Sequence, residues 1–126
     1  MCIRDSYEVV PGVTSAIAAL DSAGIPVTYR GVSQSFHIIA GHTKSSEDDE
    51  ALSEDDDTLT DNYEVLAKLE GTLVFLMGLS NLEQIANKLM QYGKDGNTPA
   101  AVISNGTMKN EKICRATLDN LSLIHI

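Results

Sequence analysis

The chain has 126 residues, 43% of them hydrophobic, which is enough for one compact domain with a mainly aliphatic core. Its formal net charge of −9 argues against nucleic acid as a partner, although the charge is local, because residues 47–57 hold eight acids and no base. No apolar run approaches membrane-spanning length, and Cys2 and Cys114 have no metal-ligand spacing, so we expect a reduced cytoplasmic protein with no membrane or metal partner.

The first predicted unit is a strand, a sharp turn and a helix. Residues 7–10 end in two β-branched valines, and the proline that follows cannot donate to a strand ladder. Thr14 or Ser15 can cap a helix that runs to about Ala23, before Gly24 ends it. Such a turn, at the carboxyl end of a strand in an α/β sheet, is where ligands usually bind. An ordinary strand-to-helix connection has the same pattern, and the residues alone leave both interpretations open.

The middle of the chain combines apolar strands with a long polar stretch. The expected elements are, in order, a strand at 36–40, a solvated loop at 41–62 whose acidic part is 44–62, a short helix at 63–69 capped by Asp61 or Asn62, and a strand at 72–77. The run at 72–77 is almost continuously apolar, which is typical of a strand covered on both faces.

The remaining pattern continues the alternation of helices and strands. A capping box at Ser80–Glu83 predicts a helix start, with an apolar face formed by Leu82, Ile85, Ala86 and Leu89 and an end at Gly93. The expected elements after it are a buried strand at 98–103, a turn at Asn105–Gly106, a strand at 112–117, and a helix capped by Thr117. This order predicts an α/β fold, a layered sheet with flanking helices.

No combination of residues predicts a catalytic centre, so catalytic residues stay unassigned. His37 lies in or beside a predicted strand and His42 follows a glycine at its end; neither has a sequence partner, so we expect structural roles. The chain has no glycine-rich phosphate loop. The acidic run lacks the glycine and spacing of an EF-hand, which argues against a calcium site. A nucleotide-like ligand would have to be held by backbone groups at strand ends.

Short strings along the chain resemble the tetrapyrrole methylase family. They are, in order, PGVTSA at 11–16, GIPVT at 24–28, SQSFH at 33–37, GHT at 41–43, GTLVFLMGL at 71–79, TPAAV at 98–102 and NGT at 105–107. Each string is weak alone, but their number and order make the resemblance specific. Within the family, the chain is most similar to the members that methylate uroporphyrinogen III.

The resemblance implies a domain assignment. Residues 7–121 correspond to the C-terminal α/β domain of the tetrapyrrole methylase fold. The family's N-terminal half, with its glycine-rich GPG and GGDP loops, has no counterpart, so we expect an incomplete fragment. Residues 1–6 and 122–126 do not fit the family pattern and resemble translated adapter sequence. Cys2 and His125 are therefore left out of the functional reasoning.

The resemblance also implies a function. Members of the family have two α/β domains with S-adenosylmethionine in the cleft between them. The implied enzyme is a cytoplasmic homodimer that transfers methyl groups to C-2 and C-7 of uroporphyrinogen III, giving precorrin-2 on the route to siroheme and cobalamin. The fragment alone is expected to be inactive. The alternatives are another precorrin methyltransferase of the same family and a non-catalytic α/β binding domain.

Five residues inherit expected roles from the family motifs. Thr14 and Ser15 match the pair after PGV that contacts the cofactor, Met77 matches the methionine of the LMG strand end, and Gly106 matches the glycine of NGT. Arg30 follows GIPVT and is expected to face the substrate, whose many carboxylates favour a cation. Without the resemblance, Arg30 would be interpreted as a surface arginine and Met77 as a core residue.

Overall fold

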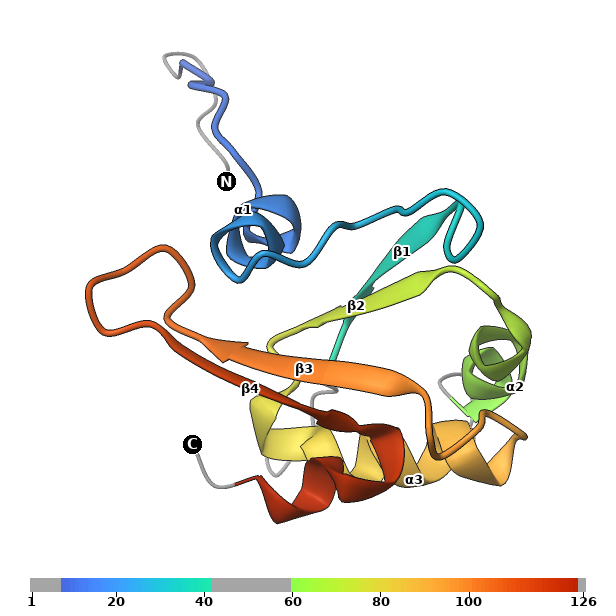
Figure 1. Ribbon diagram of the computed structural model, residues 1–126. Helices are drawn as coiled ribbons and strands as arrows, with labels where there is room; N and C mark the ends of the chain where they lie inside the picture. The colour runs from blue at the N-terminus through green and yellow to red at the C-terminus, as the bar shows by residue number, and fades with distance from the viewer. Residues whose placement is uncertain (1–7, 42–59, 125–126) are drawn as a thin grey trace, which may run out of the picture.

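The computed structural model describes residues 8–41 and 60–124 (Figure 1). The predicted acidic loop, His42, Cys2 and His125 lie outside the described residues, except for the last residues of that loop, which belong to a helix. The elements are, in order, α1 (Ser15–Ser22), β1 (Phe36–Ala40), α2 (Thr60–Lys68), β2 (Thr72–Leu76), the 3-10 helix η2 (Leu79–Asn81), α3 (Leu82–Gln91), β3 (Pro99–Ser104), β4 (Lys112–Thr117) and the 3-10 helix η3 (Leu118–Leu123).

The strands form two small sheets. β1 and β2 are parallel, with Phe36 opposite Thr72 and Ala40 opposite Leu76, and the crossover between them contains α2. β3 and β4 form an antiparallel hairpin, with Pro99 opposite Thr117 at its base. The predicted α/β class is confirmed. The order of the strands along the chain is as expected, but they do not form one continuous ladder within the described residues.

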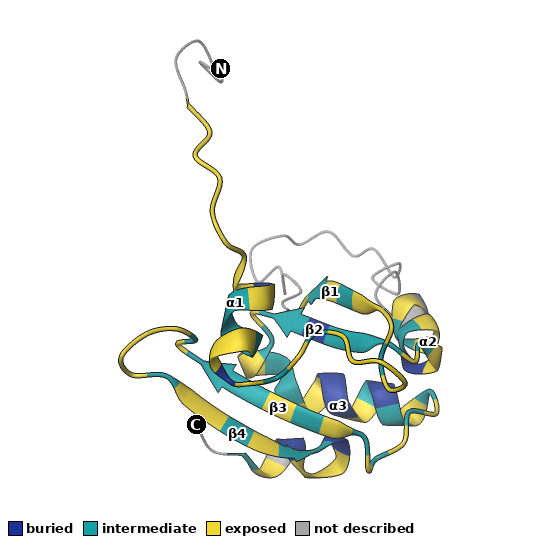
Figure 2. Cartoon of the chain, turned by 45° about the horizontal axis from the view of Figure 1, so that its top comes forward, coloured by how far each residue is buried: buried dark blue, intermediate teal, exposed yellow. Residues whose placement is uncertain are grey.

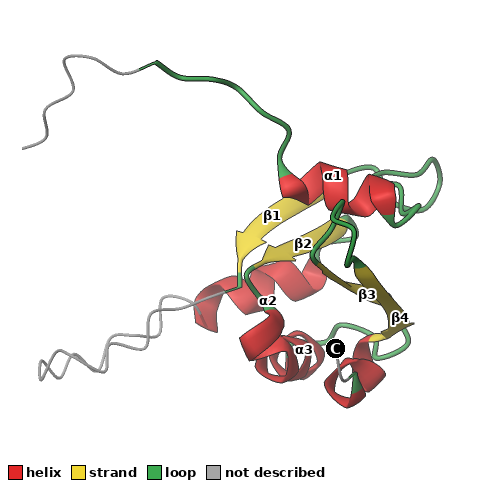
Figure 3. Cartoon of the chain, turned by 90° about the vertical axis from the view of Figure 1, so that its left-hand side faces the viewer, coloured by secondary structure: helices red, strands yellow, loops and turns green. Residues whose placement is uncertain are grey.

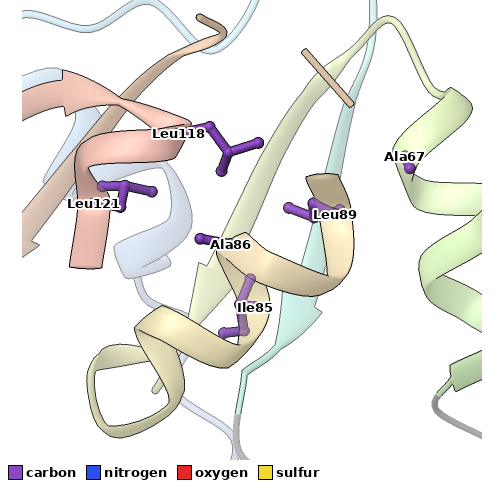
Figure 4. Packing of buried hydrophobic residues seen from close by; sticks show 6 residues of the cluster. All are labelled: Ala67, Ile85, Ala86, Leu89, Leu118 and Leu121. Atoms are coloured by element: carbon purple, nitrogen blue, oxygen red, sulfur yellow. The ribbon is translucent and has the colours of Figure 1, made fainter. Parts of the chain in front are cut away.

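The molecule has three layers. Figure 3 shows α1 on one side of the strands and α2, α3 and η3 on the other. The core lies between the strands and α3, where Ala67, Ile85, Ala86, Leu89, Leu118 and Leu121 form one buried cluster (Figure 4). The predicted apolar face of α3 is confirmed, with Leu82 half-buried at its edge. No helix of the described chain is long and apolar enough to cross a bilayer.

The local signals around α1 are confirmed. The side chain of Thr14 accepts a hydrogen bond from the amide of Ala16 at 3.3 Å, which makes Thr14 the N-cap. Gly24 has φ +67°, a left-handed value that allows the chain to leave the helix. Ala16 and Ala23, at the two ends of this helix, are buried. The strands at 36–40 and 112–117 also have the predicted bounds.

The strand predicted at 7–10 is wrong over its described part. Residues 8–10 are coil, and Val9 and Val10 are 76% and 81% exposed (Figure 2). A strand needs a neighbour to satisfy its backbone groups, and no described strand lies alongside this segment. β-Branched side chains alone therefore do not make a strand here.

The burial of two strands was overestimated. In the strand predicted at 72–77, only Val74 is buried, and β3 alternates between exposed and half-buried residues in its first half. The physical reason is that α2, α3 and η3 cover one side of the strands, whereas α1 covers only part of the other. The apolar runs thus predicted the presence of these strands correctly. The prediction that both faces of each strand are buried was wrong.

Three helix starts differ from the predictions. Ser80 lies within η2 and does not cap α3; the N-cap is Asn81, whose side chain makes no cap bond and instead donates to the carbonyl of Gly41 at 2.9 Å. α2 begins at Thr60 rather than at Tyr63, because the polar residues before the tyrosine join the helix. Thr117 precedes a 3-10 helix without capping it, since its hydroxyl instead bonds Asp119 and Asn120.

Candidate functional site

The start of α1 presents two exposed hydroxyl side chains. Thr14 is extended, with φ −72° and ψ 140°, and its carbonyl accepts hydrogen bonds from the amides of Ile17 and Ala18. Ser15 is the first helical residue and is exposed like Thr14. A helix N-terminus carries unpaired amides and the positive end of the helix dipole, so this edge favours a ligand with a negative group.

The turn after β3 lies directly against α1. A Cβ atom placed on Gly106 would be 2.6 Å from the Cβ of Ala19 and 3.2 Å from its Cα, so only glycine allows this approach. Ala19 is five residues beyond Thr14, which puts the contact about 7 Å along the helix axis from the N-cap. The structure therefore brings Thr14, Ser15 and Gly106 to the same helix.

Polar contacts fix the same hairpin to α1. Glu111 Oε2 accepts hydrogen bonds from the Thr107 amide at 2.6 Å and from the Ser22 hydroxyl. These bonds, first that from Ser22 and then that from Thr107, lower the pKa of the Glu111 carboxyl. Arg115 donates to the carbonyl of Ala23, at the end of the helix. The hairpin is thus held to α1 by Glu111 in the β3–β4 connection and by Arg115 on β4.

Met77 lies one residue beyond β2 and has φ +59°. Its side chain is 71% exposed, so the interpretation of Met77 as a core residue is wrong. The carboxyl ends of β1 and β2 meet closely beside it, because the amide of Gly41 donates to the carbonyl of Leu76 and a Cβ on Gly41 would be 2.6 Å from the Cα of Gly78. β2 and β3 run in the same direction across α3 in Figures 1 and 2, so Met77 and Gly106 follow strand ends at the same edge.

Arg30 is not brought to that edge. It is exposed in a turn in which the amide of Tyr29 donates to the carbonyl of Ser33 at 2.8 Å. The hydroxyl of Ser33 lies 2.9 Å from that of Thr72, at the amino end of β2. At about 3.3 Å per residue, this end is roughly 13 Å from Leu76. Arg30 is therefore separated from Met77 by about the length of the parallel strands.

Two residues that hold the β3–β4 hairpin against α1 were missed by sequence reasoning. Ser22 and Glu111 are 89 positions apart, and neither lies in one of the family strings. No local signal could have paired them, because the contact exists only when the β3–β4 hairpin lies on α1. His37, for which a structural role was expected, lies on β1 with its Nε2 3.4 Å from the Ser35 hydroxyl. The described residues contain no group of three or more potential metal ligands.

Comparisons with known proteins identify similar chains. The family model of the tetrapyrrole (corrin/porphyrin) methylases matches residues 3–122. The chain is 41% identical over 116 residues to a uroporphyrinogen-III C-methyltransferase of Bacillus subtilis, covering 92% of this chain and 41% of that protein. It is 40% identical to an S-adenosyl-L-methionine-dependent uroporphyrinogen III methyltransferase of Methanosarcina barkeri, covering 92% and 42%. The chain thus spans about two-fifths of the length of these curated relatives.

A solved structure has the same fold. The uroporphyrin-III C-methyl transferase of Thermus thermophilus, complexed with S-adenyl homocysteine, superposes with a TM-score of 0.71 at 26% identity. The match covers 94% of this chain and 46% of the Thermus chain. A cobalt precorrin-4 methyltransferase has a TM-score of 0.69 at 24% identity, which shows a common fold.

Proposed function

The chain belongs to the tetrapyrrole methylase family, as its motifs predicted, and on that premise we propose that it forms part of an enzyme that methylates uroporphyrinogen III. The methyl donor is S-adenosylmethionine, and the acceptor atoms are C-2 and C-7, which gives precorrin-2 for siroheme or cobalamin. The single observation that carries the proposal is the approach of Gly106 to Ala19, which gathers the PGVTSA and NGT segments on one helix.

The residues at this edge fit S-adenosylmethionine. The hydroxyls of Thr14 and Ser15 stand at a helix start, which suits the carboxylate of the amino-acid end of the ligand. Met77 and Leu79 are exposed apolar side chains, 71% and 52%, next to the end of β2, and an adenine ring is held by apolar contact of this kind. Gly106 keeps the turn free of a side chain. We propose these four previously predicted residues, Thr14, Ser15, Met77 and Gly106, as cofactor contacts.

The chemistry requires little of the protein beyond positioning. When bound, S-adenosylmethionine supplies an electrophilic methyl group to an electron-rich pyrrole carbon. The task of this chain is then to orient the donor and to exclude alternative geometries, which can contribute much of the rate. A nucleophile–base pair is not needed for such a transfer, and the proposal assigns none.

Arg30 is proposed as a substrate contact despite its distance from Met77. Uroporphyrinogen III carries carboxylates around its rim, so a cation far from the methyl donor can still bind one of them. Arg30 is exposed, as this role requires. Replacement of Arg30 by alanine is expected to raise the KM for the tetrapyrrole without changing that for S-adenosylmethionine; an unchanged KM for the tetrapyrrole would exclude the contact.

The whole enzyme is proposed to be a cytoplasmic homodimer. Phe36 and Ile38 on β1, 38% and 50% exposed, offer apolar surface for association, and Cys114 is a free thiol, which fits a reducing compartment. A monomeric mass from light scattering of the full-length enzyme would contradict the proposed homodimer. Cell fractionation that recovered the protein outside the cytoplasm would contradict the proposed location.

The test joins residues 8–121 behind the part of the Bacillus subtilis relative that precedes its matched segment; this chimaera is the joined enzyme. We expect it to bind S-adenosylhomocysteine and to transfer label from S-adenosylmethionine to uroporphyrinogen III, whereas the 126-residue chain alone is expected to be inactive. The intact Bacillus enzyme is the control. If the chimaera methylates a precorrin but not uroporphyrinogen III, the chain belongs to another precorrin methyltransferase of the family. If the chimaera folds but binds no cofactor, the chain is a non-catalytic binding domain.

A further inference from the structure

The contact between Glu111 and Ser22 joins the loop after β3 to the last residue of α1. One carboxylate oxygen accepts both the Ser22 hydroxyl and, at 2.6 Å, the Thr107 amide. The Ser22 hydroxyl has one hydrogen and also lies 3.0 Å from the carbonyl of Ala19, so without Glu111 it can turn to its own helix. Loss of Glu111 therefore leaves no orphaned hydroxyl, but it does release the loop.

The segment that Glu111 holds is a turn with unfavourable backbone angles. Asn105 has φ +52° and Thr107 has φ +68°. A β-branched residue such as threonine is rare at positive φ, and such conformations persist only where the surroundings hold them. Inside the turn, the amide of Met108 donates to the carbonyl of Asn105 at 3.0 Å. The bond from the Thr107 amide to Glu111 is the contact that fixes the strained threonine from outside.

The turn also has no room to move closer to the helix. The contact of Gly106 with Ala19 is already closer than any side chain would allow. A turn released at Thr107 can therefore relax only by moving away from α1. That movement would carry it away from α1, whose first turn bears the hydroxyls of Thr14 and Ser15.

We propose that Glu111 is a positioning residue that holds the turn at 105–107 against α1 and thereby sets the affinity for the methyl donor. The inference rests on the proposed function, because it deepens the role of that same edge. Glu111 acts through Thr107 and Ser22 and does not itself touch the ligand. Like any exposed glutamate, Glu111 is ionised near neutral pH, where a carboxylate is the stronger acceptor, and its two hydrogen bonds lower its pKa further.

The experiment compares three variants of the joined enzyme. Glu111→Ala removes both acceptor contacts, whereas Glu111→Gln keeps an oxygen that can accept them and serves as the rescue. Asp95→Ala is the matched control, because Asp95 also accepts a backbone amide, that of Asn97 at 2.9 Å, in an exposed turn at the opposite end of β3. S-Adenosylhomocysteine binding is measured by calorimetry, and KM and kcat are measured with both substrates.

We expect Glu111→Ala to weaken S-adenosylhomocysteine binding by about tenfold, the lower end of what a hydrogen bond to a charged group contributes. The KM for S-adenosylmethionine should rise by a similar factor while the KM for the tetrapyrrole stays constant. Glu111→Gln should recover most of the affinity, and Asp95→Ala should retain it. In the 126-residue chain, hydrogen exchange of the Thr107 amide should be faster in Glu111→Ala than in the parent chain, and it should be unchanged in Glu111→Gln and Asp95→Ala.

Each outcome decides between the two ideas. If the joined enzyme binds S-adenosylhomocysteine and Glu111→Ala binds it equally well, the positioning role is wrong while the proposed function stands. If the matched control loses as much affinity as Glu111→Ala, the effect is general destabilisation and the positioning role is again wrong. If the unmodified joined enzyme binds no S-adenosylhomocysteine, the proposed function fails and the inference fails with it.

Discussion

The contact of Gly106 with Ala19 allows a quantitative test of how α1 is held. Gly106 has no left-handed backbone angle, so alanine can adopt its conformation, but the added Cβ would lie 2.6 Å from that of Ala19. Overpacking of this kind costs about 1–3 kcal/mol. Ala19→Gly alone should cost about 1 kcal/mol through helix propensity. In the double variant the contact with the Ala19 Cβ is absent and only the 3.2 Å approach to the Cα at position 19 remains, so the two costs should not add in full.

The expected coupling free energy is therefore about 1–2 kcal/mol, in favour of the double variant. Thermal unfolding of the 126-residue chain measures it, because 1 kcal/mol shifts Tm by about 4 °C in a domain of this size. Gly12→Ala is the control, since nothing lies within 4 Å of a Cβ at that position. The packing of the turn on α1 is wrong if Gly106→Ala does not change the free energy of unfolding. It is also wrong if Gly106→Ala lowers that free energy equally with alanine and with glycine at position 19.

Three further predictions use the same unfolding assay. Because its two hydrogen bonds lower the pKa of Glu111, the ionised form stabilises the fold above the ordinary glutamate pKa, and this contribution is lost as the pH falls through the lower folded-state value. Tm should thus fall less between about pH 6 and about pH 3 in Glu111→Gln than in the parent chain; parallel profiles would contradict this. Leu89→Ala should cost about 2–5 kcal/mol, because Leu89 is 4% exposed in the core, while Val65→Ala, at a position 61% exposed, should be nearly neutral. Equal losses would mean that the core is misassigned. Replacing residues 47–57 with a short Gly/Ser linker should leave Tm unchanged, because like charges repel and little there is apolar; a large fall would refute it.

Elements defined by local pattern were predicted well. The strand at 112–117 and the apolar face of α3 depend on side-chain periodicity, which the sequence contains directly. The capping box at Ser80–Glu83 failed because Ser80 lies within η2, and the side chain of the actual N-cap, Asn81, bonds to the carbonyl of Gly41, 40 positions away. The strand at 7–10 failed for the complementary reason, because a strand depends on a neighbour that the local pattern cannot supply.

The candidate site shows the same division between local and tertiary information. Family motifs could nominate Thr14, Ser15 and Gly106 one by one, yet the contacts that assemble them are tertiary. No local pattern in the helix at 15–22 indicates that the turn packs on Ala19, 87 positions away from Gly106. The steric contact at Ala19 and the polar contact at Glu111 act on one short turn, one by leaving no space and the other by holding its strained backbone. Since both contacts locate the turn on α1, a larger side chain at Ala19 should displace it in the same direction as loss of Glu111, and the two kinds of variant should weaken ligand binding at this edge through one movement.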